Sequence, residues 1–233
     1  GARPRRYARM AASLDPPWGV TTARTLDLAG PQQNVPDTAP RDDLGRLRPA
    51  HEGCGSCRAG EENYCEAGVL YTYCGVEPDG SITYGGYSTD IVVNERFVFR
   101  VPDNLHPAAA APLLCAGITT YSPLRLIQLA PGDTIAIMGL GGLGHMAVQF
   151  AVAMGAEVTV LSRSPDKAED AARFGAHDFV DTRQQDSLSK HAGRFRYIVD
   201  TIAVEHDLNS ALACLQRDGT LVMLGVSATP LAL

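Results

Sequence analysis

From residue 133 onward, short apolar segments alternate with amphipathic stretches along the chain. Five segments have the composition of buried strands: 134–138, 157–161, 178–180, 197–201 and 220–225. Three stretches between them carry apolar residues at helical spacing: 144–154, 166–174 and 206–215. Near-continuous apolar strands that alternate with helices indicate a parallel sheet covered on both faces. The pattern predicts an α/β, doubly wound parallel sheet of five strands, and the chain stops at Leu233 before a sixth.

The first half of the chain has a different texture. Residues 1–50 are rich in Pro and Arg, contain no Lys and show no sustained period, which predicts coil. From residue 51 a Cys/Gly loop leads to segments 81–93 and 97–102, whose β-branched and aromatic residues predict an antiparallel β unit. Residues 107–129 are rich in Ala and Leu and predict helix interrupted by prolines.

A glycine-rich turn joins the first strand of the alternating region to its first helix. It matches the pattern G-x-G-x-x-G and consists of Gly139, Leu140, Gly141, Gly142, Leu143 and Gly144. The first glycine permits the tight turn, the second lets the backbone approach a pyrophosphate, and the third lets helix and strand pack closely. The helix N-terminus supplies free N–H groups for phosphates. We interpret the region as a Rossmann dinucleotide-binding domain; the alternative is a glycine-rich turn without a ligand.

The end of the second strand indicates which dinucleotide is bound. An NAD site usually places Asp or Glu there for the ribose 2′-hydroxyl, whereas this chain has Ser162, Arg163 and Ser164, followed by Lys167. Charge-assisted hydrogen bonds contribute about 1.5–3 kcal/mol each, so even one would favour NADP(H) over NAD by about tenfold. The alternative is that Arg163 and Lys167 are solvated surface charges.

Three of the six cysteines cluster in one loop, with the spacing His51-x2-Cys54-x2-Cys57-x7-Cys65. Zinc prefers tetrahedral Cys/His sets, and a site closed by four protein ligands is structural. A cluster in a chain without a secretory signal favours metal ligation over disulfides and hence a reducing, cytoplasmic compartment. His51 is either the fourth ligand or a histidine unrelated to the metal.

Four segments together carry a family resemblance: Cys57–Cys65, Tyr84–Tyr87, Pro112–Pro123 and Gly139–Gly144. With them, the chain resembles zinc-containing medium-chain alcohol dehydrogenases, in the cinnamyl alcohol dehydrogenase branch, over residues 51–233. The resemblance implies three parts: an unassigned stretch, disordered or foreign to the fold (1–50), a partial GroES-like catalytic domain with the zinc loop (51–118), and a truncated Rossmann NADP-binding domain (119–233).

The resemblance also implies roles for single residues. Structural-zinc ligands fall on Cys54, Cys57 and Cys65, with His51 where the family has a fourth cysteine. The last protein ligand of the catalytic zinc falls on Cys115. Cofactor-contacting positions fall on Thr119, Gly139 to Gly144, Ser162, Lys167, Thr201 and Gly225, with Arg163 and Ser164 in the same 2′-phosphate segment. Such an enzyme passes hydride between NADP(H) and a primary alcohol or aldehyde, which a zinc ion polarises.

The chain departs from the family upstream of the cysteine loop. The catalytic zinc needs an early Cys and a Gly-His-Glu segment, yet residues 1–50 contain neither Cys nor His. His51-Glu52 lies three residues from Cys54, so we do not assign it to that site. We therefore expect an incomplete catalytic zinc site in a truncated chain. The alternatives are an inactive fragment that binds cofactor and structural zinc, and a zinc-free reductase of the quinone or enoyl type.

Charge and hydropathy limit the class of partner. The net charge is −6, no long basic run occurs, and no apolar run reaches the roughly 18 residues of a membrane helix. We expect a small-molecule alcohol or aldehyde as partner, neither nucleic acid nor membrane, and the resemblance is compatible with a homodimer of the full-length parent. His206 is expected at the surface, Cys214 is expected to be buried, and Asp200 is assigned a structural hydrogen bond rather than a role in the site.

Overall fold

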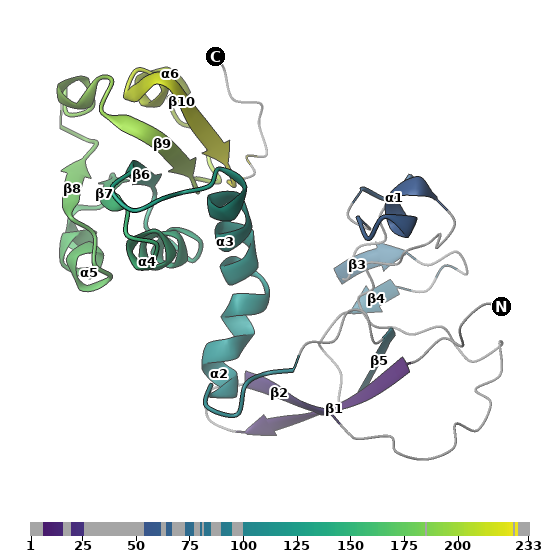
Figure 1. Cartoon of the computed structure of the whole chain (residues 1–233). Helices are drawn as coiled ribbons and strands as arrows, with labels where there is room; N and C mark the ends of the chain where they lie inside the picture. Colours follow the sequence, from purple (N-terminus) through teal and green to yellow (C-terminus); the bar gives the residue numbers. More distant parts are fainter. Residues whose placement is uncertain are drawn as a thin grey trace. The chain divides into compact units, whose positions relative to one another are not determined.

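The computed structural model describes residues 7–15, 20–25, 54–61, 64–66, 73–76, 80, 82–84, 90–94, 100–184, 186–225 and 227. The chain forms two compact units, Gly1–Ala108 and Ala109–Leu233 (Figure 1). Among the described residues no helix has the length and apolarity to cross a membrane.

The second unit is built on a five-stranded sheet. Its strands are β6 (Thr134–Met138), β7 (Glu157–Ser162), β8 (Asp178–Asp181), β9 (Phe195–Asp200) and β10 (Leu215–Met223). They lie in the order β10-β9-β6-β7-β8, and every neighbouring pair is parallel. The predicted doubly wound sheet is confirmed. Because the chain runs outward from β6 in both directions, a crevice forms where the carboxyl ends of β6 and β9 meet.

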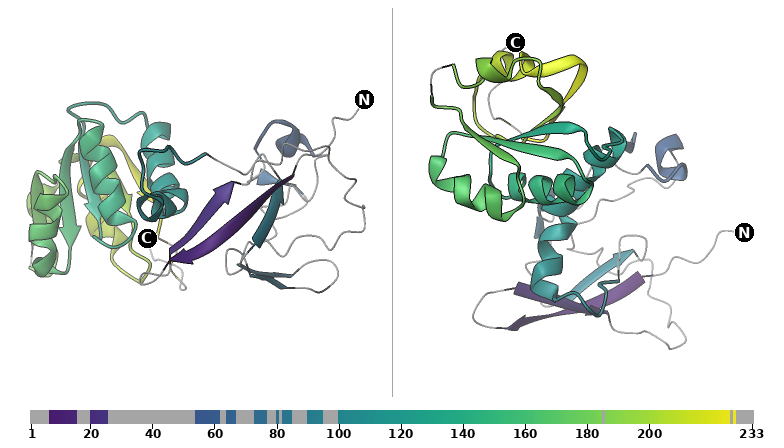
Figure 2. Two further views of the ribbon diagram at one scale, coloured as in Figure 1. Left: turned by 90° about the horizontal axis from the view of Figure 1, so that it is seen from below. Right: turned by 60° about the vertical axis from the view of Figure 1, so that its left-hand side comes forward.

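Helices cover both faces of this sheet, as Figure 2 shows. They are α3 (Ala116–Leu126), α4 (Gly144–Ala153), α5 (Ala168–Arg173) and α6 (Leu208–Leu212), with short 3-10 turns η3 (Ala111–Leu114), η4 (Pro165–Lys167) and η5 (Ser189–His191). Side chains of β6 alternate between the two layers, as the period of a strand requires. Ile135 and Ile137 pack with α3, α4 and α5, whereas Ala136 and Met138 pack on the side of α6.

The helix expected over 206–215 is shorter than predicted. Asp207 caps it by accepting hydrogen bonds from the N–H groups of Asn209 and Ser210, so α6 begins at Leu208. It ends at Leu212 because Leu215 already pairs with Phe195 as the first residue of β10.

Arg194 contacts residues near the amino ends of the neighbouring strands. The guanidinium of Arg194 lies 3.1 Å from Asp178 in β8 and 3.5 Å from Glu157 in β7. Its carbonyl oxygen accepts hydrogen bonds from Thr134 Oγ1 in β6 (3.1 Å) and Gln216 Nε2 in β10 (2.9 Å). Since Arg194 directly precedes β9, all five strands meet at this residue.

The first unit contains two small antiparallel sheets. Strands β1 (Tyr7–Asp15), β2 (Val20–Thr25) and β5 (Asp90–Asn94) form one in the order β2-β1-β5, and β3 (Tyr73–Val76) pairs with β4 (Ile82–Tyr84) in the other. A short helix, α1 (Gly55–Arg58), lies in the cysteine loop, and α2 (Pro107–Ala110) leads into the second unit.

The prediction of coil throughout residues 1–50 is wrong for two stretches. β1 pairs with β2 from Met10↔Thr25 to Asp15↔Val20, and with β5 from Tyr7↔Asn94 to Ala11↔Asp90. Apolar residues alternate along 8–14, which is a strand signal. The nearby Pro16-Pro17 and the arginines obscured it, and the partner strand β5 lies far away in the sequence.

Candidate functional site

The glycine turn lies at the carboxyl end of β6, at the crevice of the sheet. Gly139 has a φ of +82°, which favours glycine, and its N–H donates to Leu161 O across to β7 (2.9 Å). A Cβ at Gly144 would overlap the carbonyl oxygen of Gly139, so the start of α4 packs directly against the turn. A Cβ at Gly141 or Gly142 would meet no protein atom within 4 Å. The protein's own packing therefore does not explain glycine at these two positions, which face open space.

The loop after β9 closes the other side of the turn. The backbone N–H of Thr201 donates to Met138 O (3.0 Å), and its hydroxyl donates to the same oxygen (2.8 Å). A Cβ at Gly225, just after β10, would overlap the carbonyl of Ile202. The predicted cofactor residues Thr201 and Gly225 are thus brought together with the glycine turn around one crevice.

The hydroxyl and cationic groups predicted to bind the ribose lie at the carboxyl end of β7, which flanks β6 on the side opposite β9. Ser162 is buried, and its Oγ accepts a hydrogen bond from the N–H of Ser164 (3.1 Å), which leaves its O–H able to donate. Lys167 donates from Nζ to Leu140 O (2.9 Å), so the cation is held against the glycine turn. Arg163 is exposed.

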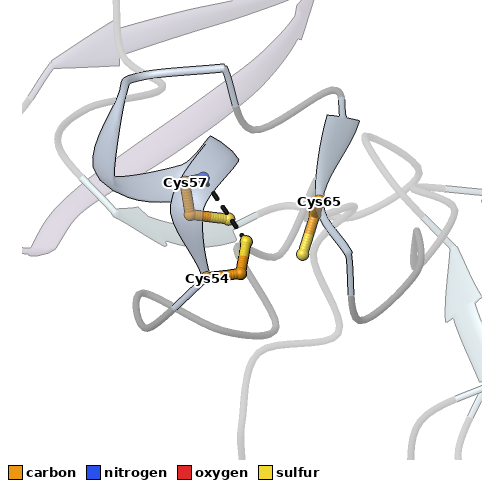
Figure 3. Close-up of side chains that lie close together, drawn as sticks. All are labelled: Cys54, Cys57 and Cys65. Atoms are coloured by element: carbon orange, nitrogen blue, oxygen red, sulfur yellow. Dashed lines mark hydrogen bonds between the residues drawn. The ribbon is translucent and has the colours of Figure 1, made fainter.

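The cysteine loop brings three thiols together, as Figure 3 shows. Cys54, Cys57 and Cys65 are buried, and their sulfur atoms all lie within 4.8 Å of one another. Cys54 precedes α1, and its Sγ accepts a hydrogen bond from the N–H of Cys57 (3.4 Å). A tetrahedral zinc with Zn–S bonds of ~2.3 Å needs sulfur atoms about 3.8 Å apart, which a trio within 4.8 Å of one another can accommodate. The predicted fourth ligand, His51, lies outside the described residues.

The pKa values of the Cys54 and Cys57 thiols are shifted in opposite directions. The backbone N–H groups of Cys57 and Glu66 lower the pKa of Cys54 to about 7. Burial and the neighbouring thiols raise the pKa of Cys57 to about 12. Packed without a cation, the three sulfurs can therefore not all ionise near neutral pH, and a bound metal would displace the remaining protons.

Cys115 lies apart from this trio in the sequence and is exposed. It precedes α3, and its carbonyl accepts a hydrogen bond from the N–H of Thr119 one turn later (3.0 Å). Within the described residues, Cys54, Cys57 and Cys65 form a group of potential metal ligands, and Cys115 joins no such group.

Sequence reasoning missed a pair at the crevice. His206 was expected at the surface, but its side chain is only 10% exposed and its Nε2 lies 2.9 Å from Oδ2 of the fully buried Asp200. The expectation for His206 is wrong because the chain turns back after β9. The contact spans a loop, in which neither the helix period nor the strand period applies, so no pattern pointed to it. The structural hydrogen bonds expected for Asp200 are present.

The amino-acid sequence is similar to those of known dehydrogenases. The family model described as zinc-binding dehydrogenase matches residues 142–233. The chain is 50% identical over 182 residues to a probable formaldehyde dehydrogenase of Bacillus subtilis, covering 77% of this chain and 52% of that protein. It is also 50% identical over 179 residues to the NADP-dependent alcohol dehydrogenase C 1 of Mycolicibacterium smegmatis, covering 76% of this chain and 51% of the relative. The chain thus spans about half the length of these curated relatives.

The fold is also similar to solved structures of alcohol dehydrogenases. A cinnamyl alcohol dehydrogenase from Sorghum bicolor superposes with a TM-score of 0.74 at 42% identity, covering 78% of this chain and 53% of that structure. A structure from Helicobacter pylori, described as CAD complexed with NADP(H), superposes with a TM-score of 0.75 at 29% identity, covering 97% of this chain and 70% of that structure.

Proposed function

The chain belongs to the zinc-containing medium-chain alcohol dehydrogenase family, in its cinnamyl alcohol dehydrogenase-like branch, and on that premise we propose that it supplies the NADP(H) site of an alcohol dehydrogenase. An enzyme with this site passes hydride between NADP(H) and a primary alcohol or aldehyde. The observation that carries this proposal is the open glycine turn at the crevice, with hydroxyl and cationic groups on one side of it.

The glycine turn holds the diphosphate. Glycine at 141 and 142 leaves the space in front of the backbone open, where a Cβ would otherwise project. α4 begins at the third glycine without a side-chain cap at Leu143, and the positive end of its dipole favours an anion at the turn. The turn therefore binds two phosphates through backbone donors, without a side chain between ligand and chain.

The groups after β7 select the phosphorylated ribose. Ser162 has a free donor, Arg163 is exposed beside it, and Lys167 is anchored to the carbonyl of Leu140. An ammonium fixed by one hydrogen bond still has two N–H donors for a phosphate. Ser162, with Arg163 and Ser164 directly after it, takes the place where an NAD site carries its acidic residue.

The cysteines supply metal ligands. Cys54, Cys57 and Cys65, with His51, would hold a structural zinc, and Cys115 would be one ligand of the catalytic zinc. The catalytic zinc, when bound, polarises the oxygen of the aldehyde or alcohol. The five cysteines whose side chains are described form no disulfide, which supports a reducing, cytoplasmic location.

The proposed function is tested with the chain itself. Isothermal calorimetry with NADPH and NADH is expected to give a Kd for NADPH that is lower by about tenfold or more. Metal analysis is expected to find about one zinc per chain, in keeping with one structural site. No measurable affinity for NADPH, or a clear preference for NADH, would overturn the proposal.

A further inference from the structure

Asp200 is the last residue of β9, and both of its carboxylate oxygens and its backbone carbonyl take part in hydrogen bonds. Its Oδ1 accepts a hydrogen bond from the N–H of Ile202 (2.9 Å), and its Oδ2 lies 2.9 Å from His206 Nε2. Its backbone carbonyl accepts from the N–H groups of Leu224 (2.8 Å) and Gly225 (3.0 Å) after β10. The residue thus joins the end of β9, the following loop and the end of β10, although its side chain is fully buried.

The hydrogen bonds of His206 indicate a charged pair. Its Nδ1 lies 2.8 Å from the carbonyl oxygen of Val204, which can only accept, so Nδ1 carries a proton. An ionised Asp200 also only accepts, so Nε2 carries a proton as well. With Asp200 ionised, both nitrogens of the ring donate and the two side chains form an ion pair. Glu205 and Asp207 flank His206 in the chain, and the cationic His206 helps to lower the pKa of Asp207, after the larger contribution of Ser210.

The loop of residues 201–206 is therefore fixed at both ends. At its start, Thr201 is bonded to Met138 and Gly139, and an added Cβ at Gly139 would lie 3.2 Å from Cγ1 of Ile202. At its end, His206 is bonded to Asp200. The loop lies directly against the glycine turn.

The position of this loop in the sheet decides which half of the cofactor it faces. β7 and β9 flank β6 on opposite sides. The adenosine ribose is read at the end of the strand that follows the glycine turn, which is β7. Since the dinucleotide crosses the crevice at β6, its nicotinamide half extends toward β9. We propose that Asp200 and His206 are positioning residues, whose ion pair holds loop 201–206 against the nicotinamide half of the NADP(H) site. This inference rests on the proposed function.

The binding test compares two ligands that share the phosphorylated adenosine half of the cofactor. NADPH spans both sides of the crevice, whereas adenosine 2′,5′-bisphosphate occupies only the adenosine side. In calorimetry with the full chain, His206→Leu is expected to weaken NADPH binding by about tenfold, the effect of one charge-assisted hydrogen bond. The affinity for the bisphosphate is expected to stay within about twofold. General damage to the fold would weaken both ligands alike.

A conservative variant and a matched control complete the test. His206→Gln keeps a donor for Asp200 and is expected to retain NADPH affinity within about threefold. His177 also makes a hydrogen bond through its ring, but it is exposed and accepts from the N–H of Val158 at the amino end of β7 (3.1 Å). His177→Leu is expected to leave the affinities for both ligands unchanged.

Nitrogen NMR of cofactor-free, 15N-labelled chain tests the ion pair separately. Both ring nitrogens of His206 are expected to be protonated at neutral pH in the wild type, and one of them in Asp200→Asn. A neutral His206 in the wild type, or equal losses for both ligands in His206→Leu, would overturn the positioning role alone. A wild-type chain that binds neither ligand would overturn the proposed function and this inference with it.

Discussion

Gly141→Ala is expected to separate cofactor binding from folding at the glycine turn. The added methyl group meets no protein atom within 4 Å, and Gly141 does not have a positive φ. Alanine also restricts the unfolded chain more than glycine does, which stabilises a compatible site by about 0.4–1 kcal/mol. For a chain of this size, the Tm is expected to rise by about 1–4 °C.

The same methyl group projects into the space assigned to the diphosphate. It forces the phosphates away from the backbone N–H groups, and we expect the Kd for NADPH to increase by about tenfold or more. The change is measured by calorimetry and by the quenching of NADPH fluorescence, with the Tm of each variant taken by differential scanning calorimetry.

Gly144→Ala is the matched control, because its Cβ overlaps the carbonyl oxygen of Gly139 and lies 3.3 Å from Thr201 Oγ1. Overpacking of this kind costs about 1–3 kcal/mol, so this variant is expected to lose both stability and binding. A Gly141→Ala chain that binds NADPH as the wild type does, or that is destabilised as much as Gly144→Ala, would refute the assignment of the open space to the diphosphate.

Further predictions concern the ribose side, the metal and one ion pair. Lys167→Met is expected to weaken NADPH binding by about tenfold and to leave NADH binding unchanged in calorimetry; equal losses for both would contradict the 2′-phosphate role. Ser162→Asp is expected to reverse the preference toward NADH, because the carboxylate repels the phosphate. Cys57→Ser is expected to abolish zinc binding in metal analysis, while a zinc content equal to the wild type would exclude the cysteine trio as the site. Arg183 lowers the pKa of Asp181 through a hydrogen bond of 3.1 Å, so this contact stabilises the fold above about pH 4 and is lost as the pH falls through the folded-state pKa. NMR titration of Arg183→Ala should show a higher pKa for Asp181, and an unchanged value would refute the coupling.

The parts of the fold predicted from sequence are those with local signals. After Thr134, the strand Thr134–Met138 is continuously apolar because both faces of the sheet are covered, and the glycine turn follows it directly. The spacing of Cys54, Cys57 and Cys65 is likewise local. Such signals lie within a few residues of each other, so one sequence suffices to read them.

The parts that were missed depend on contacts between distant segments. Tyr7–Asp15 becomes a strand by pairing with Asp90–Asn94, and the short alternation within it does not identify that distant partner. Asp200 and His206 meet because a loop reverses direction, and an acid followed by a histidine after an irregular spacing is not a motif. The helix Leu208–Leu212 is short because of a cap and a competing strand pairing.

Arg194 has a consequence for how this domain tolerates change. Its contacts connect Glu157, Asp178, Thr134 and Gln216 at the edge of the sheet opposite the crevice, through groups that need no ligand. The sheet can thus be assembled before any nucleotide arrives, and its strands stay in register when the cofactor leaves. Substitutions at the crevice that change the preferred dinucleotide leave the contacts of Arg194 intact. One fold can therefore serve several cofactor preferences.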